Sequence, residues 1–555
     1  MQSRIAGFMM LLATATMTLI VPCAAQEDTL KIKTSQIENA EIIIGMEFIP
    51  SERDSMLDDL NYTLGLYEDL RDVSIDNSVS PALIFSPLPP GVRPTREQKP
   101  PVYSPIGEVK RPENLEDLAF YSVRELAELI RTRKVNSTEL TGLCLNRLKK
   151  YDPQLHCVIT LTEELAFKQS ARADSEIAAG NYRGPLHGIP YGAKDLLAVK
   201  GYKTTWGAMP YKDQMLDYDA TVIKKLEGAG AVLVAKLSMG ALAWGDVWYA
   251  DTTRNPWNTE KGSSGSSAGS ASAVSAGLVP FAIGTETWGS IVSPSTVCGT
   301  TGLRPTYGRV SRAGAMALSW SMDKIGPICR SAEDCAIVFD AIRGPDGVDM
   351  SVIDAAFNYN YNIDLKNLRI GYLKEDFDND TSFAESNAAT LNELRQLGVE
   401  LIEIKLPDLP IDPMQIILSA EAAAAFDELT RSNRDDLLVR QIKNAWPNSF
   451  RVSRFIPAVE YIQANRIRTM LIAQMAELMA DIDVYVSPSW EGDNLLLTNL
   501  SGHPCVVLPS GFDEGGEPTS ITFIGRLFDE ATVLAVAKIY QDATDFHKKH
   551  PPLFK

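Results

Sequence analysis

The chain has 555 residues, of which 45% are hydrophobic and 22% are charged, so it can bury a large core and most of it is not disordered. Its formal net charge is −18 and its pI is near 4.9, with no basic cluster to offset the acidic residues. These values argue against binding to the phosphates of a nucleic acid or to anionic lipid, and we expect no nucleic acid partner.

The beginning of the chain, residues 1–25, is arranged like an export signal. Arg4 precedes an apolar stretch, and small residues end at Ala25. We predict cleavage before Gln26 and therefore an exported protein, periplasmic or secreted. Cys23 raises the alternative of a lipoprotein anchor, although the proline before it stands where such a signal has a small residue. No other apolar run is long enough to span a membrane.

Six of the seven cysteines remain after this cleavage, an even number in a compartment where disulfides persist. The sequence does not fix their pairing. Cys144 lies in a helical pattern and Cys335 in an apolar run, so buried free thiols are an equally good interpretation.

Residues 26–115 form an N-terminal extension with one predicted helix and a proline-rich arm. The helix, residues 51–72, has its larger apolar residues on one face, which another element must cover. The arm, residues 80–105, cannot be a helix or an inner strand, because its prolines lack the N–H donors that both need. We expect it to lie extended over the main body. A recognition arm for a polyproline-binding partner is the alternative.

The main body, residues 116–555, alternates helical patterns with short apolar strands. This alternation predicts an α/β fold, with a large mixed β-sheet core flanked by α-helices on both faces. The expected elements are helices 123–130 and 137–150, a helix after Thr162, helix 221–227 with strand 231–236, helix 386–397 with strand 399–404, and helix 462–480 with strand 483–486.

A run of small residues, 262–306, lies near the middle of the chain and holds two candidate nucleophiles, Ser266 and Ser290. A flexible linker is the alternative, but the apolar segment 278–283 within the run needs a core to bury it. We interpret the run as closely packed backbone, because glycines let segments approach one another and leave amide N–H groups uncovered. Uncovered amides are what an oxyanion site requires.

The sequence has no HExxH and no CxxC pattern, so we expect neither a metal nor a cofactor. A GxSxG pattern, residues 265–269, matches the nucleophile elbow of an α/β-hydrolase with Ser267 as the nucleophile. An elbow needs a strand directly before it, whereas residues 254–264 are predicted to be a loop. An esterase that uses Ser267 is a rival hypothesis, against which this missing strand speaks.

Four segments resemble the amidase signature family, whose members hydrolyse amides with a triad of serine, cis-serine and lysine. They are GPLHGIPYGAKD (184–195), SGSSAGSASAV (264–274), GTETWGSIVSPS (284–295) and GLRPTYGRVSRAGA (302–315). The resemblance runs from about residue 117 to the end and implies that residues 116–555 are an amidase domain. Carried over by position, it implies Lys194 as the base, Ser266 as the cis-serine that relays the proton, and Ser290 as the nucleophile.

The same resemblance implies further roles around the triad. Ser267 would be a supporting hydroxyl. The oxyanion hole would be made by the backbone N–H groups of Thr287, Trp288, Gly289 and Ser290.

The choice of base agrees with the chemistry of serine. A serine hydroxyl is a poor nucleophile until a base takes its proton, and without a suitable histidine the candidate is a lysine held neutral. Burial lowers the pKa of a lysine, so Lys194 can serve if it lies in the core. The alternative is a structural lysine paired with the neighbouring Asp195.

The chain departs from the family pattern at two positions near the nucleophile. Trp288 stands where the family usually has glycine, and Val292 stands where it usually has arginine, which removes a fixed positive charge. Six of the eight tryptophans fall between Trp206 and Trp320, which suggests an aryl or otherwise apolar acyl pocket. Ordinary core packing of these rings is the alternative.

Together these features predict an exported, cofactor-independent serine amidohydrolase that cleaves the C–N bond of a linear carboxamide, a small molecule. An esterase or carbamate hydrolase on the same triad and a non-catalytic binding protein of the cell envelope are alternatives. A glutaminase subunit of a tRNA-dependent amidotransferase is a third, against which the export signal and the absence of a basic cluster speak. The sequence leaves the oligomeric state open.

Overall fold

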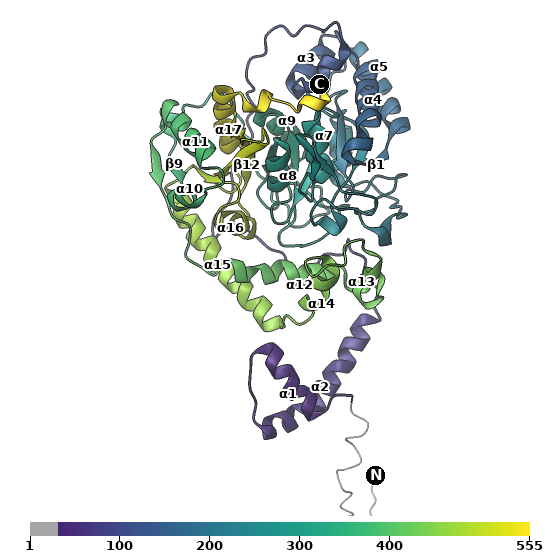
Figure 1. Ribbon diagram of the computed structural model, residues 1–555, viewed down its shortest axis with the longest axis vertical. Helices are drawn as coiled ribbons and strands as arrows, with labels where there is room; N and C mark the ends of the chain where they lie inside the picture. Colours follow the sequence, from purple (N-terminus) through teal and green to yellow (C-terminus); the bar gives the residue numbers. More distant parts are fainter. Residues whose placement is uncertain (1–30) are drawn as a thin grey trace, which may run out of the picture. The chain divides into compact units, whose positions relative to one another are not determined.

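The computed structural model describes residues 31–555 (Figure 1). The chain divides into two compact units, with the boundary between Ile75 and Asp76. The predicted export signal and Cys23 lie outside the described residues.

The first unit contains two helices, α1 (Thr34–Ile44) and α2 (Pro50–Arg71), where the sequence predicted one. The prediction of α2 is confirmed, and α1 supplies an element that packs against it. Arg53 of α2 pairs with the buried Glu41 of α1 at 2.7 Å. The apolar pattern does not indicate α1, because its isoleucines 42–44 are consecutive and exposed rather than spaced along one face.

An 11-stranded mixed sheet forms the centre of the second unit, which confirms the predicted α/β class. Its strand order is β1-β3-β2-β6-β8-β7-β12-β13-β11-β9-β10. Strand β2 is parallel to β3 and β6, whereas β8 is antiparallel to β6 and β7. The strands are β1 (Val158–Leu161), β2 (Pro190–Lys194), β3 (Val232–Leu237), β6 (Phe281–Glu286), β7 (Thr301–Arg304), β8 (Lys324–Cys329), β9 (Ile370–Tyr372), β10 (Leu401–Glu403), β11 (Val484–Pro488), β12 (Cys505–Phe512) and β13 (Pro518–Gly525).

Helices lie on both sides of this sheet (Figure 1). They are α3 (Val123–Arg131), α4 (Ser137–Leu155), α5 (Glu163–Ala178), α6 (Thr221–Gly228), α7 (Ala268–Ser275), α8 (Val292–Cys298), α9 (Ala332–Ile342), α10 (Lys374–Asn379), α11 (Ala384–Gln396), α12 (Ile416–Ala425), α13 (Asp427–Arg431), α14 (Trp446–Ser453), α15 (Ala458–Ala480), α16 (Asn494–Ser501) and α17 (Glu530–Thr544). Every residue of α7 is buried, and this helix packs on β2, β6 and β8. The run of small residues is therefore closely packed core, as predicted, and not a linker.

One predicted helix end is wrong. The helix that begins at Ser137 was expected to end at Lys150, but α4 continues to Leu155 and includes Pro153 in its last turn. The Asp152 carboxylate accepts the backbone N–H groups of two residues just beyond the helix, at 2.8 and 2.9 Å. These bonds tie the chain that leaves the helix to its last turn.

The proline-rich arm lies extended over the second unit, as predicted. The backbone N–H of Val102 donates to the Tyr359 carbonyl at 2.8 Å. Phe85 packs edge-on against Tyr307, with ring centroids 4.9 Å apart, and the Arg468 guanidinium lies 3.5 Å from the centroid of the same Phe85 ring. Phe85 thus finds its partners on the main body, whereas Leu83 and Ile84 remain exposed.

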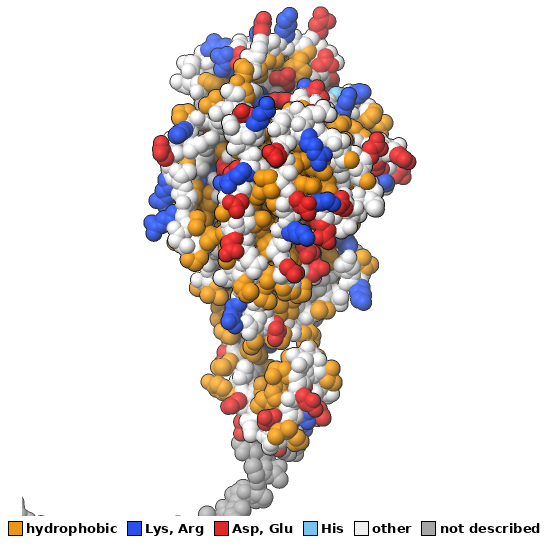
Figure 2. Space-filling view, turned by 90° about the vertical axis from the view of Figure 1, so that its left-hand side faces the viewer, with side chains coloured by type: hydrophobic (Ala, Val, Ile, Leu, Met, Phe, Trp, Pro, Cys, Tyr) orange, Lys and Arg blue, Asp and Glu red, His pale blue; other side chains and the backbone are white. Residues whose placement is uncertain are grey.

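All six cysteines of the described chain are buried and none forms a disulfide, which agrees with the free-thiol interpretation. Within residues 31–555, no helix combines the length and the apolar composition that a bilayer crossing needs. On the face drawn in Figure 2, acidic and basic side chains are interspersed.

A buried ion pair joins α17 to the loop after β7. Arg309 and Glu530 are both fully buried, with 3.1 Å between their charged groups. The guanidinium also donates to the carbonyls of Ala355 and Ala356, and the carboxylate accepts the Thr306 N–H. Every charged atom of the pair therefore has a partner inside the core.

We expect Glu530→Ala to lower the free energy of unfolding by about 3–5 kcal/mol, because it leaves the Arg309 charge buried without its partner. Urea unfolding followed by tryptophan fluorescence measures this change. The matched control is Asp217→Asn, which breaks an exposed pair with Lys200 and should leave the transition unchanged. Equal transitions for both variants would contradict the expectation.

Candidate active site

The nucleophile candidate lies in the turn between β6 and α8. All residues of β6 are buried at the centre of the sheet, and the chain reverses direction directly after it. Gly289 adopts a φ of +82°, a left-handed conformation in which a side chain would be strained. Ser290 follows it and lines a cavity of about 710 Å³, which we call the main cavity.

Lys194 is the last residue of β2, the parallel neighbour of β6. Because parallel strands end at the same edge of a sheet, Lys194 lies close to the end of β6. Its Nζ is 2.8 Å from Ser266 Oγ, 2.8 Å from Thr285 Oγ1 and 3.1 Å from Ser267 Oγ. Lys194 is fully buried, and it forms no ion pair with any carboxylate of residues 31–555.

Burial lowers the pKa of Lys194 to about 7, although the charges of Asp323 and Glu286 oppose this shift. The predicted alternative, a pair between Lys194 and Asp195, does not form. Asp195 instead pairs with Lys236 at 2.7 Å and accepts the Thr205 hydroxyl. Lys194 can therefore be neutral near pH 7, as a general base must be.

Ser266 follows a cis peptide bond between Gly265 and Ser266, which is the conformation that the family resemblance implied. The position of Gly265 allows no side chain, because a Cβ there would lie 1.9 Å from the carbonyl oxygen of Gly245. This close approach places the fully buried Ser266 hydroxyl against Lys194.

Ser267 lies on the protein side of this arrangement. Its fully buried Oγ donates to the Thr285 carbonyl and accepts the Thr285 N–H, both at 3.0 Å. It does not line the main cavity, so the rival elbow hypothesis lacks an accessible nucleophile. The loop predicted before it is in fact a hairpin, β4 (Arg254–Asn255) and β5 (Asn258–Gly262), which is separate from the main sheet.

The four residues expected to form the oxyanion hole all line the main cavity, and one of them is the nucleophile candidate itself. They are Thr287, Trp288, Gly289 and Ser290. Among the described residues, none of their backbone N–H groups donates to a protein acceptor. Four unused donors beside one hydroxyl can stabilise a developing negative charge without rearrangement.

Glu286, a buried carboxylate that lies in the third motif but was given no role from the sequence, holds this turn. Glu286 accepts the N–H groups of Ile291 and Val292 at 2.8 and 2.9 Å and pairs with Arg304 at 2.9 Å. Burial alone would raise the pKa of Glu286, but the Arg304 charge and the hydrogen bonds outweigh it and lower the pKa. Val292, which replaces the family's arginine, is fully buried in an apolar cluster, and Arg304 is the cation beneath the turn.

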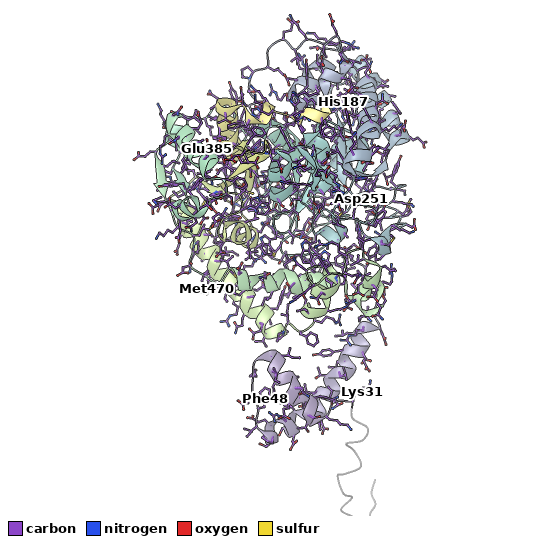
Figure 3. All side chains as sticks on the ribbon, in the orientation of Figure 1. Lys31, Phe48, His187, Asp251, Glu385 and Met470 are labelled. Carbon is purple, nitrogen blue, oxygen red and sulfur yellow. The ribbon has the colours of Figure 1, made fainter. Side chains whose placement is uncertain are left out.

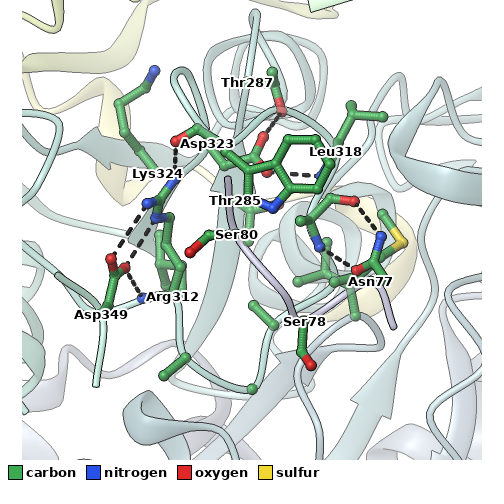
Figure 4. A pocket seen from close by; sticks show the side chains of 18 of the residues that line it. Asn77, Ser78, Ser80, Thr285, Thr287, Arg312, Leu318, Asp323, Lys324 and Asp349 are labelled. Carbon is green, nitrogen blue, oxygen red and sulfur yellow. Dashed lines mark hydrogen bonds and ion pairs between the residues drawn. The ribbon is translucent and has the colours of Figure 1, made fainter. Parts of the chain in front are cut away.

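A second carboxylate that the sequence did not indicate orients Thr287 (Figure 4). The Thr287 hydroxyl donates to Asp323 at 2.5 Å, and Asp323 also accepts the N–H groups of Leu318 and Ser319. These groups border a small chamber of about 110 Å³, which Asn77 of the extension also lines. Sequence spacing gives no signal for Asp323, because it lies 36 positions from Thr287 and belongs to none of the four motifs.

The structure corrects part of the hypothesis that the tryptophans between Trp206 and Trp320 form an apolar acyl pocket. Of the six tryptophans named from the sequence, Trp244 and Trp288 line the main cavity. Trp446 and Trp490, which come from distant segments, complete the aromatic wall. Trp206 and Trp248 are buried and do not line it, so core packing explains these rings.

No three His, Cys, Asp or Glu side chains of residues 31–555 are grouped so that they could share a metal ion. None of the described histidines lines the main cavity. His187, labelled in Figure 3, is fully buried and lies 3.1 Å from Glu176 of α5.

Comparison with known proteins agrees with this geometry. The sequence profile of the family described as Amidase matches residues 139–494. A glutamyl-tRNA(Gln) amidotransferase subunit from Acinetobacter baumannii (strain AYE) is 34% identical over 483 residues, which is 78% of this chain and 98% of that protein. The native peptide amidase of Stenotrophomonas maltophilia has a similar structure, with a TM-score of 0.71, 27% identity and coverage of 79% of this chain and 100% of that one.

A second structure of the same kind is the corresponding glutamyl-tRNA(Gln) amidotransferase subunit from Thermotoga maritima, with a TM-score of 0.65, 26% identity and coverage of 77% of this chain and 95% of that one. The family profile, these relatives and the shared fold lead to one conclusion: the chain belongs to the amidase signature family and is a hydrolase that acts on the C–N bonds of amides.

Proposed function

We propose that the protein is an exported serine amidohydrolase that cleaves a linear, small-molecule carboxamide through an acyl-enzyme on Ser290. Lys194 and Ser266 form the proton relay. The observation that carries this proposal is the fully buried Lys194, with a pKa lowered to about 7 and an Nζ 2.8 Å from Ser266 Oγ. Neither a metal nor a histidine is needed for the steps that follow.

In the first half of the reaction, Ser290 Oγ attacks the amide carbon while its proton passes through Ser266 to Lys194. The carbonyl oxygen becomes an oxyanion, which the N–H groups of residues 287–290 stabilise. The relay then returns the proton to the leaving nitrogen, and the C–N bond breaks. In the second half, water attacks the acyl-enzyme by the same relay and releases the carboxylic acid.

The same relay can serve esters and carbamates, since each presents a carbonyl carbon to Ser290. A glutaminase subunit is a second candidate, supported by the 34% identity to proteins named as amidotransferase subunits. It would have to bind the α-carboxylate of glutamine without a cation in the wall of the main cavity, although the acidic side chains there suit the α-ammonium.

Ser290→Ala should lower kcat/KM for a primary amide by about 10⁴-fold or more, and Lys194→Ala by about 10²–10⁴-fold. Rates on wild type and both variants measure this, and a fluorophosphonate probe should label wild type but not Ser290→Ala. Ser263→Ala, in the same run but not lining the main cavity, is the matched control. Activity that survives Lys194→Ala but not Ser267→Ala would instead support the elbow hypothesis, and the absence of any labelling would support a binding protein.

The pH dependence of kcat/KM should show one limb with a midpoint near pH 7. Below it Lys194 is protonated and cannot accept a proton, so activity falls; above it the neutral amine is active. Asp323→Asn should move this limb to lower pH, because the Asp323 charge raises the pKa of Lys194. A limb that stays in place in this variant would mean that another group titrates.

Export is the part of the proposal that depends on residues 1–25. Expressed in a bacterium with an outer membrane, the protein should appear in the periplasm or medium, with Gln26 as its first residue by N-terminal sequencing. A variant without residues 1–25 should stay in the cytoplasm. A full-length chain that keeps Met1 and remains in the cytoplasm would overturn export but leave the hydrolase chemistry untouched.

A further inference from the structure

The proposed function does not say which amides are substrates. The charges of the main cavity narrow the class of substrate. We infer that the main cavity selects amides that carry a cationic group on an apolar or aromatic body. This inference rests on the proposed function only in taking the main cavity as the place where substrate binds beside Ser290.

The ionisable side chains of the cavity wall are all acidic. Asp412 comes from the short helix 412–415, and Asp493 directly precedes α16. Among the described residues that line the cavity there is no Lys, Arg or His, and neither carboxylate forms an ion pair within residues 31–555. Burial and the charge of Asp412 raise the pKa of Asp493, so the two carboxylates interact with each other.

Further negative charge stands behind this wall. Asp376 lies against Gly492, whose Cβ position would be 2.7 Å from an Asp376 oxygen. Burial and the charges of Glu491, Glu375 and Asp493 raise its pKa to about 6, because several carboxylates share a small volume. A cation brought by a ligand would relieve this repulsion.

The Arg440 cation lies close to the wall of the cavity. The Arg440 guanidinium is 5.7 Å from the centroid of Trp244. It does not line the cavity. The guanidinium also donates to the carbonyl of Asn444, a residue of the wall, at 3.0 Å, so this charge lies directly behind the wall.

The other side chains of the wall suit the body of such a ligand. Trp446 packs edge-on against Trp244 at 4.9 Å and stacks on Phe450 at 4.8 Å, so these rings are fixed before a ligand binds. Trp288 and Trp490 are 40% and 46% exposed, which leaves their rings available at the opening. Indole faces attract cations as well as apolar groups.

The same charges act against an anionic substrate. A carboxylate on the substrate would enter a cavity with two carboxylates and no lining cation, and each such pair of like charges is unfavourable. We therefore expect amides whose only charged group is a carboxylate to be poor substrates.

Two isosteric pairs of amides test the inference. In one pair the variable group is on the acyl side, 4-(trimethylammoniomethyl)benzamide against 4-neopentylbenzamide. In the other pair the variable group is on the amine side: the two compounds are the acetanilides that carry the same trimethylammoniomethyl or neopentyl group on the ring. Each pair has the same shape and differs by one positive charge. Binding is measured on Ser290→Ala by quenching of tryptophan fluorescence, and kcat/KM is measured on wild type.

We expect the cation of at least one pair to bind about tenfold more tightly than its neutral partner. The double variant Asp412→Asn with Asp493→Asn should reduce this ratio to about twofold or less. Asp408→Asn, an exposed carboxylate outside the wall, is the control and should keep the ratio. Unfolding midpoints confirm that the variants are folded.

Equal binding of cation and neutral isostere in both pairs would overturn the inference, as would a preference that survives the double variant. Because binding is read on Ser290→Ala, this result does not depend on turnover. If the cation is preferred but wild type cleaves neither pair nor any other amide or ester, the proposed function fails while the binding inference stands.

Discussion

Lys194 sits at the end of a central strand, where no carboxylate of residues 31–555 forms an ion pair with it and three hydroxyls contact its amine. This is the constraint around which the site is arranged. A carboxylate within ion-pair distance would stabilise the charged form and remove the base, whereas hydroxyls satisfy the amine without fixing its proton. The low pKa of Lys194 thus results from the packing of all the residues around the ends of β2 and β6, and no single side chain determines it.

The nearby acids are consistent with this constraint because each has a partner elsewhere. Asp195 is held by Lys236, and Glu286 by Arg304 and by the backbone of the turn. Asp323 accepts the Thr287 hydroxyl and the backbone N–H of Leu318. These carboxylates shape the site, and their bonds to other groups keep them away from the amine.

Local sequence was sufficient for part of this arrangement. The triad residues lie in short motifs, and the helix and strand patterns of the body follow spacing rules that one segment carries by itself. The missing parts depend on contacts between distant segments. Glu286 meets Arg304 and Asn499, the latter 213 positions away, and Trp446 reaches the cavity only because α14 folds back toward Trp244. Helix α1 and the β4–β5 hairpin are short, and their patterns are too weak to indicate them.

The main cavity is built from two kinds of wall. The strand end and its turn carry Ser290 and the proposed oxyanion donors, while residues 412–449 and 490–496 form the opposite side. The two carboxylates of the wall, Asp412 and Asp493, therefore lie on other segments than Ser290, although Trp288 of the turn also lines the wall. Substitutions at these two positions would change the charge of the cavity without touching the sheet that holds Lys194 and the turn of Ser290.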